Sequence, residues 1–143
     1  MKFNIKNDVN ISALEMRAER EALEIYSKES TRRERSLEEI KVTSMYGLAA
    51  EVFLLQQGYV DDTRPYKDLF EPLRFGGNSI EVKVTEGEYF VPYVLKRANA
   101  AAAEKWRDYP NRLYIFIGDR KTGDYSLEGI YDFDGVQFIK NVV

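Results

Sequence analysis

Glu81 and Lys83 lie two residues apart in the segment SIEVKV, residues 79–84. The segment alternates apolar and polar side chains, and this alternation is typical of a half-buried β-strand. In such a strand Glu81 and Lys83 project from one face, and the apolar side chains project from the other. A carboxylate and an amine on one face suit phosphate chemistry, because the carboxylate can hold a divalent cation and the amine can neutralise developing negative charge.

Further carboxylates are candidates for the same site. Asp68 lies thirteen residues before Glu81, and a hairpin of that length folds it back toward Glu81. Glu51 lies among apolar and small residues of an expected helix, where a carboxylate is costly unless it has a cationic partner. A divalent cation relieves repulsion among carboxylates, and Mg²⁺ prefers oxygen ligands. Asp61 and Asp62 are alternatives to Asp68 and rank behind it.

These residue types predict a magnesium site. Asp68, Glu81 and the carbonyl of Val82 would hold Mg²⁺, with Mn²⁺ as a substitute. Glu51 would complete the site directly, through water, or on a second metal ion. The metal would polarise a scissile phosphate and acidify a bound water, and Lys83 would steady the hydroxide and the pentacovalent charge. The sequence has no His and no Cys, so imidazole and thiolate chemistry is excluded.

The order of these residues resembles the PD-(D/E)xK nuclease superfamily, in particular its Holliday junction resolvase and restriction-endonuclease-like branches. The resemblance covers residues 47 to about 118 and is carried by Glu51, Asp68, Glu81 and Lys83. It implies an αβββαβ core with a mixed central sheet flanked by helices. It also implies metal-dependent endonucleolytic hydrolysis of phosphodiester bonds, DNA as the substrate and a homodimer.

Three helices are expected around this site. Residues 11–29 form an amphipathic helix with Ser12 as a plausible N-cap, and a second helix runs from about Ser36 to Gln57. A third helix begins at Pro92, and its Ala-rich stretch allows close packing on a sheet.

The strands are expected from apolar segments between turn residues. Residues 69–75 and 79–85 form two strands joined by a Gly-Gly-Asn turn. Residues 112–119 are nearly all apolar and predict a central strand buried on both faces. Residues 125–134 and 136–143 supply one or two more strands. The predicted fold class is α/β, a mixed sheet with helices on it.

The chain is expected to divide into an N-terminal helical extension, residues 1–35, and a nuclease-like core, residues 36–143. The extension is a candidate dimerisation element, although its apolar stripe can equally pack on its own domain. The sequence contains no apolar run near the length of a membrane span, and its first ten residues lack the apolar core of a signal peptide. We therefore expect a cytoplasmic protein.

Basic residues give weaker indications of a DNA interface. Arg32 and Arg33 would clamp a DNA backbone, or would lie in a solvated connector. Lys96 and Arg97 would contact phosphate, or would form the solvent-exposed face of the third helix.

Tyr89 and Phe90 follow the 79–85 strand in the segment TEGEYFVP. Their position makes them candidates for stacking on a splayed base. The acidic TEGE loop beside them fits poorly with a phosphate path.

Purely structural roles for these residues, and other functions of the chain, stay open as alternatives. A second Glu-x-Lys, Glu39-Ile40-Lys41, falls in an expected helix, so the motif alone carries little weight. Glu81 and Lys83 would otherwise be exposed strand charges whose pairing contributes at most ~1 kcal/mol. Glu51 would otherwise belong to a salt bridge, for example with Lys83. A nucleic-acid-binding or regulatory protein of the same fold, and an acidic protein–protein interaction or inhibitor domain, are the alternative functions.

Overall fold

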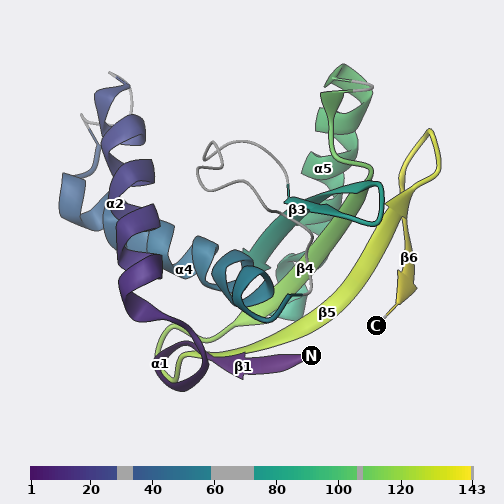
Figure 1. The fold of residues 1–143 in the computed structure, drawn as a ribbon. Coiled ribbons are helices and arrows are strands. Elements are labelled where there is room, and N and C mark those ends of the chain that lie inside the picture. The colour runs from purple at the N-terminus through teal and green to yellow at the C-terminus, as the bar shows by residue number, and fades with distance from the viewer. Residues whose placement is uncertain (29–33, 59–72, 106–107, 143) are drawn as a thin grey trace.

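A computed structural model describes residues 1–28, 34–58, 73–105 and 108–142 of the chain (Figure 1). The elements in these ranges, in chain order, are β1 (Lys2–Asn4), α1 (Ile5–Asp8), α2 (Ile11–Ser27), α4 (Leu37–Gln56), β2 (Leu73–Phe75), β3 (Asn78–Thr85), the 3₁₀ turn η1 (Glu88–Phe90), α5 (Val91–Lys105), β4 (Arg112–Gly118), β5 (Asp124–Phe133) and β6 (Phe138–Val142). The predicted α/β class is confirmed.

The described strands form one mixed sheet in the order β1-β5-β4-β3-β2, with β6 also paired to β5. β3 and β4 are parallel, and the other pairs are antiparallel. A parallel pair needs a crossover connection, which α5 provides. Figure 1 shows α2 and α4 on one side of the sheet and α5 on the other. β4 lies between β3 and β5, as its apolar sequence predicts.

The helix ends agree with most of the capping signals. Ser36 caps α4 by accepting a hydrogen bond of 3.2 Å from the Glu39 amide, and Gly58 follows the helix with a φ of 73°. The expected cap of α2 is wrong, because Asn10 rather than Ser12 accepts the hydrogen bond, from the Ala13 amide at 3.1 Å. Asn and Ser are similarly good N-caps, so the sequence alone does not favour one of the two positions over the other.

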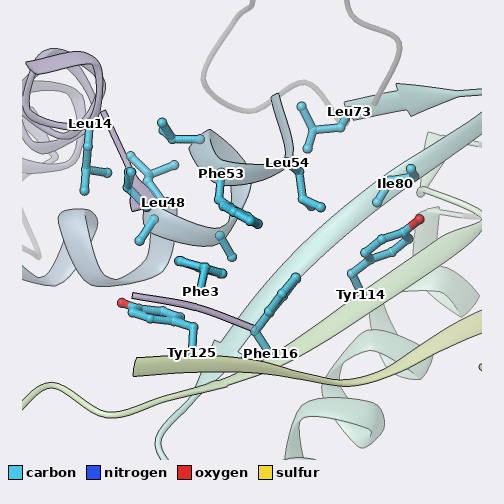
Figure 2. Packing of buried hydrophobic residues seen from close by; sticks show 14 of the residues in the cluster. Phe3, Leu14, Leu48, Phe53, Leu54, Leu73, Ile80, Tyr114, Phe116 and Tyr125 are labelled. Carbon is cyan, nitrogen blue, oxygen red and sulfur yellow. The ribbon is translucent and has the colours of Figure 1, made fainter. Parts of the chain in front are cut away.

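The N-terminal residues belong to the main core. Leu14, Ala18 and Ala22 of α2 are fully buried, and the two alanines let α2 lie close to α4. Phe3 of β1 stacks on Phe53 at 4.3 Å and on Tyr125 at 4.7 Å between ring centroids (Figure 2). The apolar stripe of α2 therefore packs on its own domain, the second of the two expectations for residues 1–35.

The opposite face of the sheet carries a smaller core under α5. Ala98 and Ala102 are buried there, against Leu113 and Ile115 of β4 and Phe138 of β6. The expected close packing of the Ala-rich helix on the sheet is confirmed.

A two-residue turn joins β2 to β3. Gly76 and Gly77 have φ values of 55° and 84°, and Phe75 pairs with Asn78 across the turn. A hairpin turn with two positive φ values requires residues such as glycine. The turn predicted from Gly-Gly-Asn is confirmed, with Asn78 as the first residue of β3.

Candidate functional site

A pocket of about 520 Å³ lies where α2, α4, β3 and the last residue of α5 approach one another. Its lining includes predicted site residues, one further carboxylate and two further cations: Glu51, Glu81, Val82, Lys83, Glu21, Arg35 and Lys105. Asp68 and its alternatives, Asp61 and Asp62, lie outside the described residues. The structure therefore brings two of the predicted carboxylates and the predicted lysine to the border of one pocket.

The alternation in β3 is confirmed. Val82 and Val84 pack on the core beneath α4, so Glu81 and Lys83 project from the other face of the strand. The Nζ of Lys83 lies 3.9 Å from Oε1 of Glu81, and their side chains are 48% and 33% exposed. An ion pair with this exposure contributes at most ~1 kcal/mol to stability.

Glu51 has a cationic partner on α2. The Nη2 of Arg17 donates a hydrogen bond of 2.5 Å to Oε1 of Glu51, and the two side chains are only 19% and 14% exposed. The expected alternative, a salt bridge from Glu51, is therefore present. The partner is Arg17 rather than Lys83, because α2 packs against α4 and brings Arg17 to Glu51.

The candidate residues approach the pocket from two sides. Glu51 belongs to the helix that covers one face of the sheet, whereas Glu81 lies level with Leu113, which is buried under α5 on the other face. Among the residues that the structure describes, no three acidic side chains gather closely enough to hold a metal ion. The donors present, two carboxylates and a carbonyl, suit Mg²⁺ by type, and the predicted ligand Asp68 stays a prediction.

Tyr109 is a neighbour of Glu81 that the sequence did not reveal. Burial raises the pKa of Tyr109 to about 12, and the negative charge of Glu81 adds to the shift. Its ring meets Phe138 edge-to-face at 6.2 Å. The phenol is therefore protonated at neutral pH, but Tyr109 does not line the pocket. An isolated Tyr before a strand gives no sequence signal that it lies close enough to Glu81 to sense its charge.

Among the other predicted contact residues, Lys96 and Arg97 do not line the pocket. Lys96 and Arg97 are exposed on α5, and Arg97 Nη1 lies 3.4 Å from the Tyr93 hydroxyl. Arg32 and Arg33 lie outside the described residues. Besides Lys83, two cations among the described residues line the pocket. Arg35 follows Arg32 and Arg33 in the sequence, and Lys105 is the last residue of α5, the helix that carries Lys96 and Arg97.

Comparison of the chain with protein-family models, with curated proteins and with solved structures found no match. The likeness to PD-(D/E)xK nucleases therefore stands on Glu51, Asp68, Glu81 and Lys83 alone. Within the described ranges, no helix has both the length and the apolar character needed to cross a membrane.

Proposed function

We propose that the chain is a Mg²⁺-dependent DNA endonuclease with a restriction-endonuclease-like core. The observation that carries the proposal is the shared pocket bordered by Glu51, Glu81 and Lys83. These side chains come from a helix and a strand far apart in sequence, and the residue types match the chemistry that their order suggested.

Each residue would have a distinct role. Glu81 and the Val82 carbonyl, together with Asp68, would hold Mg²⁺, and Glu51 would complete the set from α4. Bound Mg²⁺ would polarise the phosphate and lower the pKa of the attacking water. The Lys83 ammonium would stabilise the negative charge that develops on the phosphate.

Cations on the border of the pocket would contact the phosphates of a polyanionic substrate. Arg35, Lys83 and Lys105 line the pocket together with the carboxylates of Glu21, Glu51 and Glu81, and the whole chain carries a net charge of −3. Local cations attract a phosphate backbone whatever the total charge of the chain. Salt largely screens the interaction between exposed charges that are more than about 10 Å apart, so only nearby charges count.

The order of elements supports the same core. The helix α4 is followed by β2, β3, the crossover helix α5 and the parallel strand β4. Within the described ranges, this order contains the elements of an αβββαβ core except for one strand.

A second candidate is a DNA-binding protein of the same fold that does not cleave. The ion pair between Arg17 and Glu51 favours this candidate, because a carboxylate engaged by a guanidinium is a weaker metal ligand. The placement of Glu81 on the opposite face of the sheet favours it as well.

Incubation with plasmid and branched DNA in Mg²⁺, Mn²⁺ or EDTA tests the proposal. Cleavage should occur with either metal and stop in EDTA. Glu81→Gln and Lys83→Met should each lower the cleavage rate by at least ~100-fold, the effect typical of losing a group that stabilises transition-state charge. Glu39→Gln and Lys41→Met are matched controls, since they alter the same Glu-x-Lys spacing on α4.

The possible results separate the candidates. DNA binding without cleavage in either metal supports the second candidate. Absence of both binding and cleavage rejects both and favours an interaction domain. Thermal unfolding of each variant verifies that a lost activity does not reflect a lost fold.

A further inference from the structure

Three large aromatic side chains are exposed where β3 passes into α5. Tyr89, Phe90 and Tyr93 are 87%, 49% and 58% exposed. Aromatic side chains carry large apolar surfaces and are usually mostly buried. A group of exposed rings on one surface therefore indicates a contact with another molecule.

The rings contact one another and a cation. Tyr89 and Phe90 meet edge-to-face, with centroids 5.4 Å apart and planes at 85°. One turn along α5, the Arg97 guanidinium carbon lies 5.8 Å from the centroid of the Tyr93 ring. Such a guanidinium limits the motion of the ring and adds a planar cation beside it.

Helical spacing places Tyr93 and two cations on one face of α5, and Tyr89 and Phe90 precede that helix in η1. Tyr93 lies three residues before Lys96 and four before Arg97, so these side chains share a helix face. The inward face is occupied by Val91, Ala98 and Ala102, which pack on the sheet. We call Tyr89, Phe90, Tyr93, Lys96 and Arg97 the aromatic–basic stripe.

We propose that the aromatic–basic stripe binds a DNA strand through its unpaired bases. The rings would stack on base faces, and Lys96 and Arg97 would contact the phosphates. Base faces are accessible only where pairing or stacking is interrupted, so the substrate class is DNA with a single-stranded segment rather than a fully paired duplex. The inference rests on the proposed function for the choice of DNA.

The charges near the stripe favour this occupant. Its two cations complement phosphates, whereas an apolar protein partner would need neither of them. The acidic loop before the stripe is partly neutralised, because Arg120 Nε lies 2.9 Å from Glu86 Oε1. Glu88 remains as an exposed acidic neighbour and would weaken the binding of phosphate locally.

α5 also connects the stripe with the candidate site. The helix begins beside the exposed rings and ends at Lys105, which lines the pocket of Glu81 and Lys83. A helix of 15 residues is ~22 Å long. A strand held by the stripe can therefore run along α5 toward the pocket.

Fluorescence anisotropy in EDTA tests the inference without cleavage. The probes are a labelled oligothymidine of about 15 nucleotides, within the ~4–16 nucleotides that such surfaces cover, and a duplex of equal length. The single strand should bind more tightly. Tyr89→Ala and Tyr93→Ala should each weaken its binding about five- to tenfold, because stacking on one base is lost. Tyr26→Ala, at an exposed tyrosine of α2, is the matched control and should have no effect.

The cations give a second readout. A Lys96→Gln and Arg97→Gln double variant should reduce the slope of log affinity against log salt by ~0.7 for each lost phosphate contact. Unchanged affinity after Tyr89→Ala and Tyr93→Ala, tighter binding of the duplex, or an equal loss in Tyr26→Ala would overturn the inference. Tighter binding of oligouridine than of oligothymidine, or binding of the rings to anionic vesicles with no affinity for DNA, would overturn it too.

Failure of the inference and failure of the proposed function give different results. Stripe-dependent binding in EDTA together with no cleavage in Mg²⁺ supports the inference and rejects the nuclease. Cleavage in Mg²⁺ that is insensitive to Tyr89→Ala and Tyr93→Ala supports the nuclease and rejects the inference.

Discussion

The guanidinium of Arg17 on α2 and the carboxylate of Glu51 on α4 meet at 2.5 Å in the interface between the two helices. Both side chains are largely buried, so the contact is a charge-assisted hydrogen bond of the stronger kind. The same carboxylate borders the pocket of Glu81 and Lys83. Glu51 therefore links the packing of the N-terminal helix to the candidate site.

Loss of Arg17 should destabilise the protein. Arg17→Met leaves the Glu51 carboxylate without this partner in a largely buried position, and we expect the free energy of unfolding to fall by ~1–3 kcal/mol. Urea unfolding followed by circular dichroism measures the change. Arg20→Met, at an exposed position of the same helix, is the control and should stay within ~0.5 kcal/mol of the unaltered chain. Equal stability of the two variants would show that the ion pair contributes nothing.

Mg²⁺ should stabilise the folded chain if the pocket binds it. At a tenfold excess over Kd, binding to the folded state alone adds about 1.4 kcal/mol, which raises Tm by roughly 3–5 °C for a chain of this size. Thermal unfolding in MgCl₂ and in EDTA measures the difference. Glu81→Gln should abolish the shift, whereas Glu39→Gln should preserve it. A shift of the same size in both variants would place the metal elsewhere.

The local elements could be predicted from the sequence because their signals are local. Ser36 and Gly58 mark the ends of α4, and the alternation around Glu81 fixes which side chains of β3 share a face. The apolar run of β4 is explained by its place between two strands and two helical layers. Each of these signals is contained in residues that are close together along the chain.

The features that could not be predicted from the sequence depend on residues that are distant along the chain. β1 has only three residues, too few for a periodic pattern, and Phe3 is held by Phe53 and Tyr125 rather than by its neighbours in sequence. The contact of Glu51 with Arg17 depends on how α2 crosses α4, which no local pattern encodes. The approach of Asp68 to Glu81 stays a prediction, since Asp68 lies in a gap of the described ranges.

Alkaline pH should destabilise the protein through Tyr46. Burial raises its pKa from the ordinary value of 10.0 to about 12, and the charge of Glu86 adds to the shift, against the opposing charge of Arg120. Below pH 10 the folded and unfolded states both keep the proton, so the contribution of Tyr46 is constant. Between pH 10 and 12 the unfolded state releases the proton first, and stability falls by up to ~1.4 kcal/mol per pH unit.

Urea unfolding at several pH values between about 8 and 12 measures this loss of stability. Tyr46→Phe removes the titrating group and should make the alkaline decline less steep. The variant also loses the hydrogen bond that the Tyr46 hydroxyl donates to the Gly118 carbonyl at 2.9 Å. The slopes against pH, rather than the absolute stabilities, are therefore compared. Parallel slopes for the two proteins would contradict the prediction.

Two glycines should respond to alanine with opposite signs. A Cβ built on Gly118 of β4 would lie 2.8 Å from Cε2 of Tyr125. That ring is buried, stacks on Phe3 at 4.7 Å and donates a hydrogen bond of 2.9 Å to the Tyr46 carbonyl, so it has little room to move. Gly118→Ala should therefore lower the free energy of unfolding by ~1–3 kcal/mol, the usual cost of overpacking.

Gly47 lies inside α4, and a Cβ there meets nothing within 4 Å. Gly47→Ala should raise the free energy of unfolding by ~0.5–1 kcal/mol, because alanine loses less backbone entropy than glycine on forming a helix. Urea unfolding of both variants under one set of conditions measures the pair. A neutral Gly118→Ala would mean that Tyr125 can shift, and that the packing of Phe3, Tyr46 and Tyr125 is looser than their contacts indicate. A destabilising Gly47→Ala would mean that the open pocket wall beside Glu51 is filled by another part of the chain or by a bound molecule.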